Sequence, residues 1–460
     1  MTALEAGESS AESGGAPDIG GFGGSGTHFG GATSAPSFGG SGVAGGAPPF
    51  VEGQINGTVV DYNSQLPLPG LIVSVDGEET QTGEDGSFVL PRPLGAYNLR
   101  IADEDGTSIS VYQGLRSDSV QLVHAPTAST PRPRREIVRG AVSGELAFPL
   151  LAERPADIAS VFVLSERGLG RGLLGGGLPP FGPDYETLLT WTGPAKLDAI
   201  LFAFATTNNI TAGGASRPGY RAFAGTAAIV LQDAGDPAMQ DIELRELELG
   251  VLSGSAQLPA GAELSYYETY YRFPYPNSFV AFPNADVVGT HAAPSAKGFA
   301  FDLPKFEDSP ATLCIAARVS GTPLLRAERC GVELDADPVE LTLQPSPELS
   351  APAANAPLNA DTRFAWSEFE GGVHMLELTP HASSSRAPSV RILTAQTTFE
   401  AKELPAELLN FRSTSYQATI TGVGSFKDLD DAAGPGGLAA PVRSEALFSR
   451  SAPITLGVDP

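Results

Sequence analysis

Short stretches in which apolar side chains recur at every second position, separated by turn residues, dominate the chain. In residues 50–125, for example, Leu71, Val73 and Val75 fall on one face, and Asp76-Gly77 follows them as a turn signal. A period of two residues is typical of half-buried β-strands. The pattern therefore predicts an all-β fold, with six or seven short strands forming a small sandwich in this region.

A glycine-bounded pattern recurs along the chain and marks where each group of strands should begin. It reads Gly53-Gln54-Ile55-Asn56-Gly57, Gly140-Ala141-Val142-Ser143-Gly144 and Gly250-Val251-Leu252-Ser253-Gly254. A closing pattern of an aliphatic residue, any residue and leucine goes with it: Val120-Gln121-Leu122, Ile242-Glu243-Leu244, Val339-Glu340-Leu341 and Ile454-Thr455-Leu456. We interpret these patterns as the first and last strands of successive β-domains, because their spacing suits a row of sandwiches and not a short-repeat solenoid.

These patterns divide the chain into a predicted series of β-sandwich domains arranged as beads on a string. The predicted parts are a disordered Gly/Ser/Pro-rich tether (1–49), three sandwiches (50–125, 136–247 and 248–346) and a terminal sandwich (347–460). Residues 126–135, which include Pro131-Arg132-Pro133-Arg134-Arg135, are predicted to be a linker or an exposed cleavage site. The tether is predicted to be flexible because its composition provides too little apolar area to offset the entropy of the chain.

Two runs in the second sandwich are apolar at consecutive positions and not only at alternate ones. They cover Ile158 to Leu164 and Ala199 to Ala205. Strands of this kind are expected to be covered on both faces. Residues 168–183 are rich in Gly and Pro, and we expect them to form a long loop between strands.

The first sandwich resembles a known family. The residues that carry the resemblance are Gly57-Thr58-Val59-Val60-Asp61, Leu66-Pro67-Leu68-Pro69-Gly70, Asp85-Gly86-Ser87-Phe88 and Gly95-Ala96-Tyr97-Asn98-Leu99. They are similar to the carboxypeptidase regulatory-like domain, which has a transthyretin-like (prealbumin-like) fold. The resemblance implies an accessory role, and the family has no catalytic residues to carry over.

The terminal segment 347–460 resembles a fibronectin type III sandwich. The resemblance rests on Phe364-Ala365-Trp366 early in the segment and Tyr416-Gln417-Ala418-Thr419-Ile420 late in it. It implies that the tryptophan and the tyrosine face each other in one core. The stretch from Phe426 to Ala440 is longer than such a domain needs.

The charge of the chain narrows the classes of partner. It contains 28 Lys and Arg against 53 Asp and Glu, a formal net charge of −25. Such a surface repels phosphate backbones, so we expect no nucleic acid as partner and instead a cell-surface protein or a polysaccharide. Few of the basic residues are lysines, which together with abundant Ala and Gly indicates a GC-rich bacterial source.

The compartment is predicted from the N-terminus and from the tether. No run is long and apolar enough for a transmembrane helix, and residues 1–20 contain no leader sequence. The chain is therefore either cytosolic or a mature form whose leader has been removed. The tether resembles the spacer that follows the lipid-anchored cysteine of bacterial surface lipoproteins. That cysteine is absent here, so a lipid anchor would belong to the precursor.

Cys314 and Cys330 are the only cysteines, and they lie symmetrically about a turn signal, Ser320-Gly321-Thr322-Pro323. Antiparallel strands leaving this turn would place the two cysteines opposite each other, on the face away from Leu313 and Leu325. We predict a cross-strand disulfide, and two free thiols are the alternative. A disulfide implies an oxidising compartment and hence an extracellular or outer-surface location.

An aromatic stretch from Tyr266 to Tyr275 is the best candidate for a binding surface. In an extended strand, Tyr267, Tyr271, Phe273 and Tyr275 share one face. Aromatic rings with polar tips suit a sugar or a protein partner. The alternative is that one face of the strand is core and the other is a domain interface.

The remaining motifs favour no chemistry. Gly170-Arg171-Gly172-Leu173-Leu174-Gly175 matches the dinucleotide-binding pattern, but Gly and Pro follow it where a helix is needed. The acidic clusters Asp103-Glu104-Asp105 and Asp428 to Asp431 lack a calcium-loop spacing, so solvated turns and calcium ligands both remain open. The five histidines are scattered and lack the spacing of a zinc site. We therefore expect no catalytic residues, no metal and no cofactor.

Two classes of function are compatible with these patterns. The first is a non-catalytic extracellular or cell-surface protein that acts as a stalk, scaffold or adhesin. The second is a carbohydrate-binding or accessory module that uses the aromatic stretch at 266–275. An enzyme is disfavoured because no nucleophile–base pair or metal set is present in the pattern.

Overall fold

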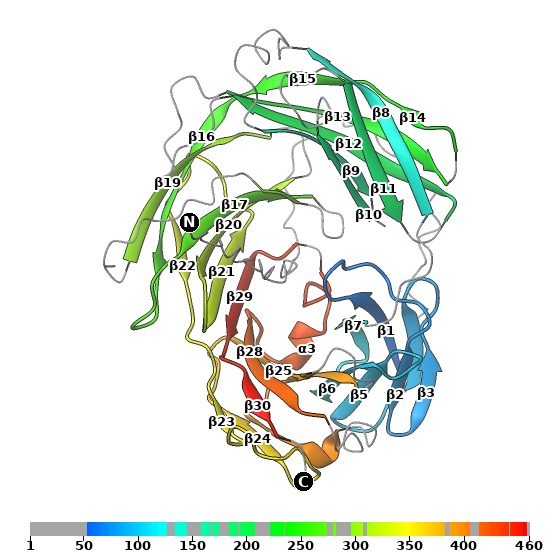
Figure 1. Cartoon of the computed structure of the whole chain (residues 1–460), viewed down its shortest axis with the longest axis vertical. Helices are drawn as coiled ribbons and strands as arrows, with labels where there is room; N and C mark the ends of the chain where they lie inside the picture. The colour runs from blue at the N-terminus through cyan, green and yellow to red at the C-terminus, as the bar shows by residue number, and fades with distance from the viewer. Residues whose placement is uncertain are drawn as a thin grey trace, which may run out of the picture.

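The computed structural model describes most of the chain beyond the predicted tether, and the fold is all-β (Figure 1). The described residues are 53–126, 134–144, 158–165, 168–173, 184–191, 194–207, 221–233, 235–273, 279–281, 296–306, 311–381, 387–404, 414–440 and 442–457. The predicted tether, residues 1–49, lies outside them. Most described residues lie in strands, and the one α-helix among them is the short α3 (Leu429–Ala432).

Residues 53–126 form two sheets that enclose one core. The strands are β1 (Gln54–Asp61), β2 (Ile72–Val75), β3 (Glu78–Gln81), β4 (Ser87–Pro91), β5 (Tyr97–Ala102), β6 (Ser108–Leu115) and β7 (Ser119–His124). One sheet has the order β4-β1-β7, and β6-β5-β2-β3 forms part of a larger sheet. Asp76 and Gly77, both at positive φ, turn the chain between β2 and β3 as the sequence predicts.

Residues 134–247 form a second unit. Its strands are β8 (Arg134–Gly144), β9 (Ile158–Ser165), β10 (Gly168–Leu173), β11 (Asp184–Trp191), β12 (Lys196–Thr207), β13 (Arg221–Gln232), β14 (Ala238–Met239) and β15 (Ile242–Leu247). They form one sheet in the order β10-β9-β12-β13-β15-β8-β11, with β14 paired to β8. The strand β10 corrects the prediction of a continuous loop over 168–183, because Gly168–Leu173 pairs antiparallel with β9. Likewise, β8 begins inside the predicted linker, at Arg134.

Residues 249–342 form a third unit, which follows β15 almost without a break. Its strands are β16 (Leu249–Gln257), β17 (Tyr266–Arg272), β18 (Phe279–Ala281), β19 (Ala296–Pro304), β20 (Thr312–Val319), β21 (Leu324–Cys330) and β22 (Val339–Thr342). A small sheet has the order β19-β16-β22, and β18-β17-β20-β21 belongs to the larger sheet.

The C-terminal residues form the fourth unit. Its strands are β23 (Leu349–Ala351), β24 (Arg363–Trp366), β25 (Gly372–Pro380), β26 (Ser389–Thr394), β27 (Thr398–Glu400), β28 (Tyr416–Gly424), β29 (Glu445–Arg450) and β30 (Ile454–Leu456). The 3₁₀-helix η2 (Ala401–Glu403) follows β27. Trp366 and Tyr416 lie in one core cluster, the arrangement that the fibronectin resemblance implies.

The repeated sequence pattern has a common structural meaning in the first three units. In each, the opening strand pairs in parallel with the closing strand: β1 with β7, β8 with β15, and β16 with β22. The second glycine permits this close approach. A Cβ atom on Gly254 would lie 2.0 Å from the carbonyl oxygen of Val339 in β22, and one on Gly144 would lie 2.3 Å from the carbonyl oxygen of Leu244 in β15. In these three units the glycine pattern therefore lies in a strand that pairs in parallel with the strand of the closing pattern.

The units are not beads on a string, because one sheet runs through three of them (Figure 1). Among the described residues this sheet has 13 strands, in the order β18-β17-β20-β21-β29-β28-β25-β26-β6-β5-β2-β3 with β30 paired to β28. Two junctions join different units through strands that are distant in sequence: β21 pairs antiparallel with β29, and β26 pairs parallel with β6. The predicted boundaries remain predictions, but the segments that they separate share hydrogen-bonded sheets.

The fully apolar strands of the second unit are covered on both faces, as predicted. Val161, Val163 and Leu201 face the core of their own unit. Phe162 and Phe202 face the other way and belong to the core cluster of the third unit. Within the described part of the chain, no helix is long and apolar enough to cross a membrane.

Candidate functional site

One face of the sheet formed by β17, β20 and β21 is polar, and the opposite face is apolar. Tyr270 pairs with Cys314, which pairs in turn with Cys330, so these three side chains share the polar face. Leu313 and Ile315 alternate with them and point into the core on the other side. The strict alternation of these strands therefore builds the site and the core at the same time.

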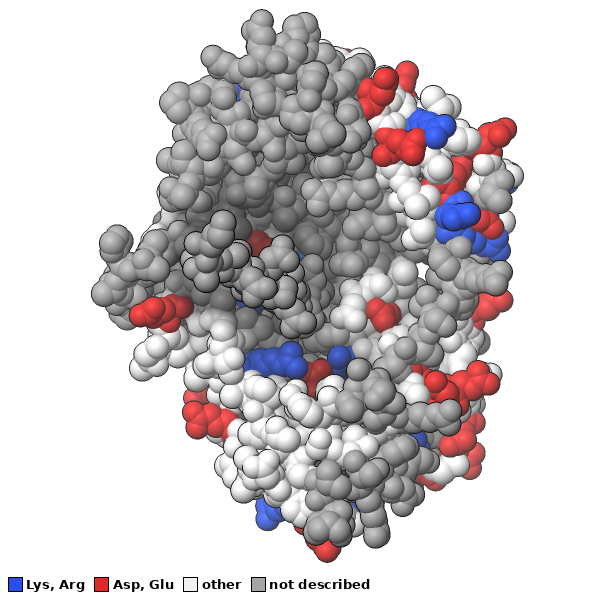
Figure 2. All heavy atoms as spheres, in the orientation of Figure 1, with Lys and Arg blue, Asp and Glu red and all other residues white. Residues whose placement is uncertain are grey.

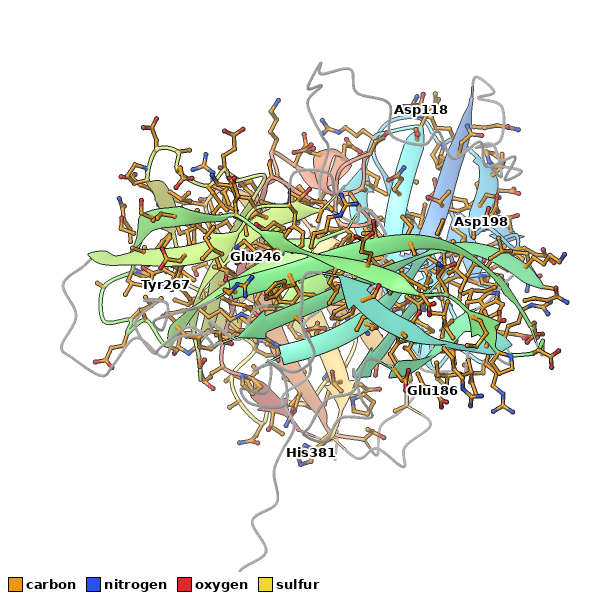
Figure 3. All side chains as sticks on the ribbon, turned by 90° about the horizontal axis from the view of Figure 1, so that it is seen from above. Asp118, Glu186, Asp198, Glu246, Tyr267 and His381 are labelled. Atoms are coloured by element: carbon orange, nitrogen blue, oxygen red, sulfur yellow. A yellow bond between two sulfur atoms is a disulfide. The ribbon has the colours of Figure 1, made fainter. Side chains whose placement is uncertain are left out.

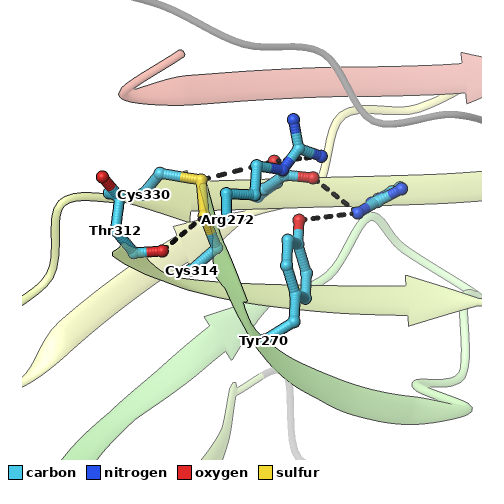
Figure 4. Close-up of a disulfide and its surroundings, with 7 residues drawn as sticks. Tyr270, Arg272, Thr312, Cys314 and Cys330 are labelled. Carbon is cyan, nitrogen blue, oxygen red and sulfur yellow. Dashed lines mark hydrogen bonds and ion pairs between the residues drawn. A yellow bond between two sulfur atoms is a disulfide. The ribbon is translucent and has the colours of Figure 1, made fainter. Parts of the chain in front are cut away.

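Cys314 and Cys330 form a disulfide that joins β20 to β21 (Figure 4). Their Cα atoms are 4.0 Å apart, and the two residues lie directly opposite each other in register. The backbone N–H of Cys330 donates to the carbonyl oxygen of Ser444, away from β20. The pair therefore occupies a non-hydrogen-bonded position, where antiparallel strands approach most closely. The structure thus contains the cross-strand bond that the spacing of the cysteines predicts.

A buried cluster of charged side chains lies beside the disulfide (Figure 4). The Glu328 carboxylate is 2.5 Å from the guanidinium of Arg326 and 3.3 Å from that of Arg272. Arg326 also donates to the hydroxyl of Tyr270 at 2.9 Å. An oxygen of Glu328 lies 3.5 Å from the Cys330 sulfur. The ion pairs and the disulfide therefore form one continuous group of contacts across β17, β20 and β21.

The electrostatics of the cluster keep Glu328 ionised. Burial opposes its charged form, but Arg326 and Arg272 outweigh burial and hold the pKa of the carboxyl below its usual value. Burial likewise raises the pKa of the Tyr270 phenol, which stays a neutral hydrogen-bond partner. Desolvation lowers the pKa of Arg443, just ahead of β29, to about 10.

Arg443 belongs to the C-terminal unit and interacts electrostatically with Glu328 of this cluster. Its guanidinium donates to the carbonyl oxygen of Gly424 and lies 4.0 Å from the centre of the Phe426 ring. Further along the same sheet face, Glu377 binds Arg391 at 2.7 Å and Arg450 at 2.9 Å. Figure 2 shows Lys and Arg side chains gathered around acidic groups in the lower centre of the molecule, whereas acidic side chains are scattered around its rim.

The aromatic stretch does not form an exposed binding surface. Tyr267 is 0% exposed, Tyr271 4% and Phe273 2%, and all three belong to one core cluster. They do share a face, but the third unit's own core and the second unit cover it. Tyr275, the fourth predicted member, lies outside the described residues. The prediction of a ligand surface is therefore corrected for these three residues.

The face of Tyr271 and Phe273 instead forms the interface between the second and third units. The ring of Phe202, from β12, lies 4.9 Å from that of Phe273 and 5.5 Å from that of Phe306. The Tyr271 ring lies 4.4 Å from the Phe306 ring, and its hydroxyl donates to the carbonyl oxygen of Pro304 at 2.5 Å. These edge-on and tilted contacts are the geometry that aromatic pairs prefer.

The other predicted motifs do not come together in one place. Gly170 to Leu173 of the dinucleotide pattern lie in β10, so a strand occupies the position that the motif needs for a turn and helix. Asp428 accepts the backbone N–H of Asp431 and caps α3, while Asp430 accepts those of Arg116 and Ser117. Figure 3 shows Tyr267 of the aromatic stretch and His381, one of the five histidines, on different parts of the molecule.

A buried chain of polar groups was not predicted from the sequence. Nδ1 of His124 lies 2.8 Å from the hydroxyl of Ser110, and Nε2 lies 3.0 Å from the Asp103 carboxylate. The order Ser–His–Asp is that of a hydrolase triad, but Ser110 and His124 are fully buried between the two sheets of the first unit. Asp103 alone reaches the wall of a small polar cavity. A substrate has no access to the hydroxyl, so the group joins β6 to β7 and supports no catalysis.

His374 is a second buried histidine and makes the stability of the protein depend on pH. Its Nε2 accepts the backbone N–H of Phe369 at 3.1 Å, and desolvation lowers its pKa from 6.5 to about 4. Between these two values the unfolded chain binds a proton that the native protein does not. Acidification from pH 6.5 to 4 is therefore expected to lower the free energy of unfolding, by about 2–3 kcal/mol from this residue.

Urea titrations of the wild type and of His374→Gln across this pH range would measure the effect. The wild type should lose stability more steeply than the variant, which cannot titrate at this position. Parallel stability profiles for the two proteins would contradict the assignment.

The one group of described residues that resembles a metal-binding set does not offer free ligands. Cys314, Glu328 and Cys330 lie within reach of one another, but both sulfurs belong to the disulfide. This arrangement supports a structural role, because a covalent bond and buried ion pairs hold three strands together. The sequence predicted the disulfide, but only the paired strands revealed the ion cluster around it.

Comparisons with known proteins show distant similarity only. No family model and no curated protein matches the chain. A fimbrial assembly protein from Parabacteroides distasonis is 11% identical with a TM-score of 0.18, over 46% of this chain and 94% of that chain. The major pilin subunit of Bacillus cereus is 10% identical with a TM-score of 0.14, over 63% of this chain and 98% of its own. TM-scores this low do not establish a shared fold, so the all-β assignment rests on the strands themselves.

Proposed function

We propose that the protein is a non-catalytic extracellular or cell-surface scaffold or adhesin of bacterial origin. The observation that carries the proposal is the disulfide inside a fully paired sheet, next to a buried ion cluster. Disulfides persist in oxidising compartments, and the sheet joins three units into one continuous body. Such a body suits a load-bearing or presenting role better than a flexible stalk.

The carboxypeptidase regulatory-like and fibronectin resemblances agree with this role as expectations about the first and last units. A carbohydrate-binding role for the aromatic stretch is not favoured, because three of its four candidate residues are buried. The partners that the proposal leaves open are a cell-surface protein and a polysaccharide. A lipid anchor in the precursor would place the tether between the membrane and the first unit.

The proposed location is tested on intact cells of the native host. We expect the protein to be degraded by added proteinase K while a cytosolic marker protein survives. The protein, denatured without reduction, should contain no thiol that reacts with a maleimide reagent. Protection from the protease together with two free thiols would contradict the proposed location. Hydrolysis of any member of a panel of peptide, ester and glycoside substrates would contradict the non-catalytic assignment.

Removing the disulfide is expected to weaken the protein without changing its fold. The bond closes a loop of sequence separation 16, for which chain entropy predicts a loss of about 3 kcal/mol in the Cys314→Ala/Cys330→Ala variant. Urea unfolding followed by circular dichroism would measure it. The difference from the wild type should shrink when a reductant is present throughout, because the unfolded wild type then loses the bond as well.

A further inference from the structure

Residues 53–126 do not complete their own core. Alongside Val73, Leu99 and Tyr112, the cluster contains Val373, Val423 and Phe448 from the C-terminal unit. On the opposite face of the same sheet, Ile109 and Val111 of β6 pack with Val390 and Ile392 of β26. Both faces of the β6–β26 junction are thus buried, and the C-terminal unit supplies a large share of the cover.

Polar contacts add specificity to this junction. β6 and β26 pair in parallel from Ser108↔Ser389 to Gln113↔Thr394. The side-chain amide of Gln113 donates to Glu403 at 2.7 Å, and the guanidinium of Arg391 lies 4.8 Å from the centre of the Tyr62 ring. The junction therefore combines backbone pairing with a side-chain hydrogen bond and a cation–π contact.

The segment from Phe426 to Ala440, longer than a fibronectin-like unit needs, belongs to the same interface. Leu429 and Leu438 enter the core of the first unit. Asp430 accepts the backbone N–H groups of Arg116 and Ser117, each at 2.8 Å. The side-chain amide of Gln65 donates to the carbonyl oxygen of Ala440 at 3.2 Å. The backbone N–H of Gln121 on β7 also donates to the carbonyl oxygen of Ala433, so the extra length covers the edge of the first unit's sheet at β7.

The next unit in the chain plays no comparable part. Among the described residues, strands β8–β15 share core clusters with the third unit but none with strands β1–β7. Residues 127–133 connect the first unit to the second, and in sequence they include Pro131 and Pro133. Among the described residues, the first unit is therefore held to the rest of the protein by the C-terminal unit. The two units are separated by more than 200 residues of chain.

We propose that residues 53–126 exchange between copies, so that β6 of one chain pairs with β26 of a second chain. The partner is a second copy of this protein, because only that copy presents the same strand edge and the same apolar cover. The contacts in an exchanged dimer are those of the closed monomer, so the path of the linker and the protein concentration decide between them. During synthesis, residues 53–126 are made long before the C-terminal unit of the same chain. The C-terminal unit of a neighbouring chain therefore has time to bind them.

Two chains, each with one cysteine added to the native Cys314–Cys330 disulfide, test the exchange. One carries Ser108→Cys and the other Ser389→Cys, with different tags, and the mixture is refolded together at high concentration without reductant. We expect a covalent dimer of differently tagged chains in which peptide mapping places the bond between positions 108 and 389. The matched control carries both substitutions in one chain and is refolded when dilute, and it should form the bond within the monomer. A bond in the control with no bond between the mixed chains would overturn the proposal.

A variant with residues 128–132 deleted tests the exchange independently, through the molecular mass of the folded protein. A shorter connection opposes closure within one chain, so its mass by light scattering should shift from monomer to dimer while its β-sheet circular dichroism is retained. A folded monomer would overturn the proposal, and so would loss of the folded signal at every concentration. Neither experiment depends on where the protein resides, so their failure would leave the proposed function intact.

Discussion

Replacing Glu328 by glutamine is expected to lower the free energy of unfolding by about 3–5 kcal/mol at pH 7. Glu328 is 3% exposed and is the carboxylate that both Arg326 and Arg272 bind. Its loss leaves two buried guanidinium groups without their counter-charge, next to the disulfide. Urea unfolding with the disulfide intact would measure the change.

The matched control is Glu340→Gln, an exposed glutamate on β22, which should change stability by less than about 0.5 kcal/mol. The pH dependence gives a second check. The Glu328 carboxyl has a pKa below its unfolded value of 4.5, so its contribution is present above that pH and is lost as the pH falls through the folded value. The gap between wild type and variant should therefore close in acid. A loss no greater than that of the control would contradict the role of the cluster.

Replacing Phe202 by alanine is expected to cost about 3–5 kcal/mol and to loosen the contact between the second and third units. Its ring is 1% exposed and contacts the rings of Phe273 and Phe306. Hydrogen exchange should show lost protection in β12 and also across the interface in β17. A variant that loses protection in β12 alone would contradict the role of this residue as a bridge.

Two substitutions control for this prediction. Leu188→Ala removes a side chain that is 49% exposed on β11, and it should change stability by less than about 0.5 kcal/mol. Phe202→Leu keeps most of the buried volume and should cost less than Phe202→Ala. If all three variants behaved alike, the cost would not come from the aromatic packing.

The local chemistry of this chain could be predicted because it depends on neighbours in sequence. Alternation placed Cys314 and Cys330 on the polar face of two strands joined by a turn, and the structure pairs them. The recurring glycines marked the strands that begin each unit, because only glycine allows the closing strand to come as near as Val339 does to Gly254. The turn at Asp76-Gly77 follows from the same local rules.

The candidate binding surface could not be predicted in the same way. Alternation shows that Tyr267, Tyr271 and Phe273 share a face, but it does not show what covers that face. The cover is Phe202 for one part and Phe299 for another, and both are remote from β17 in sequence. The ion cluster could not be predicted from the sequence for the same reason. Arg272 and Glu328 become neighbours only when β17, β20 and β21 pair.

By itself, the sequence determined that this protein is built from short strands, which strands open and close three of the parallel pairs, and which two sulfurs meet. These features depend on the period of the backbone and on turn residues a few positions apart. Only the tertiary structure decided that β6 pairs with β26 and β21 with β29, and that the aromatic stretch is internal. Ordinary core strands look alike in sequence, and the choice among distant partners depends on the apolar area and the charges that all of them bury together.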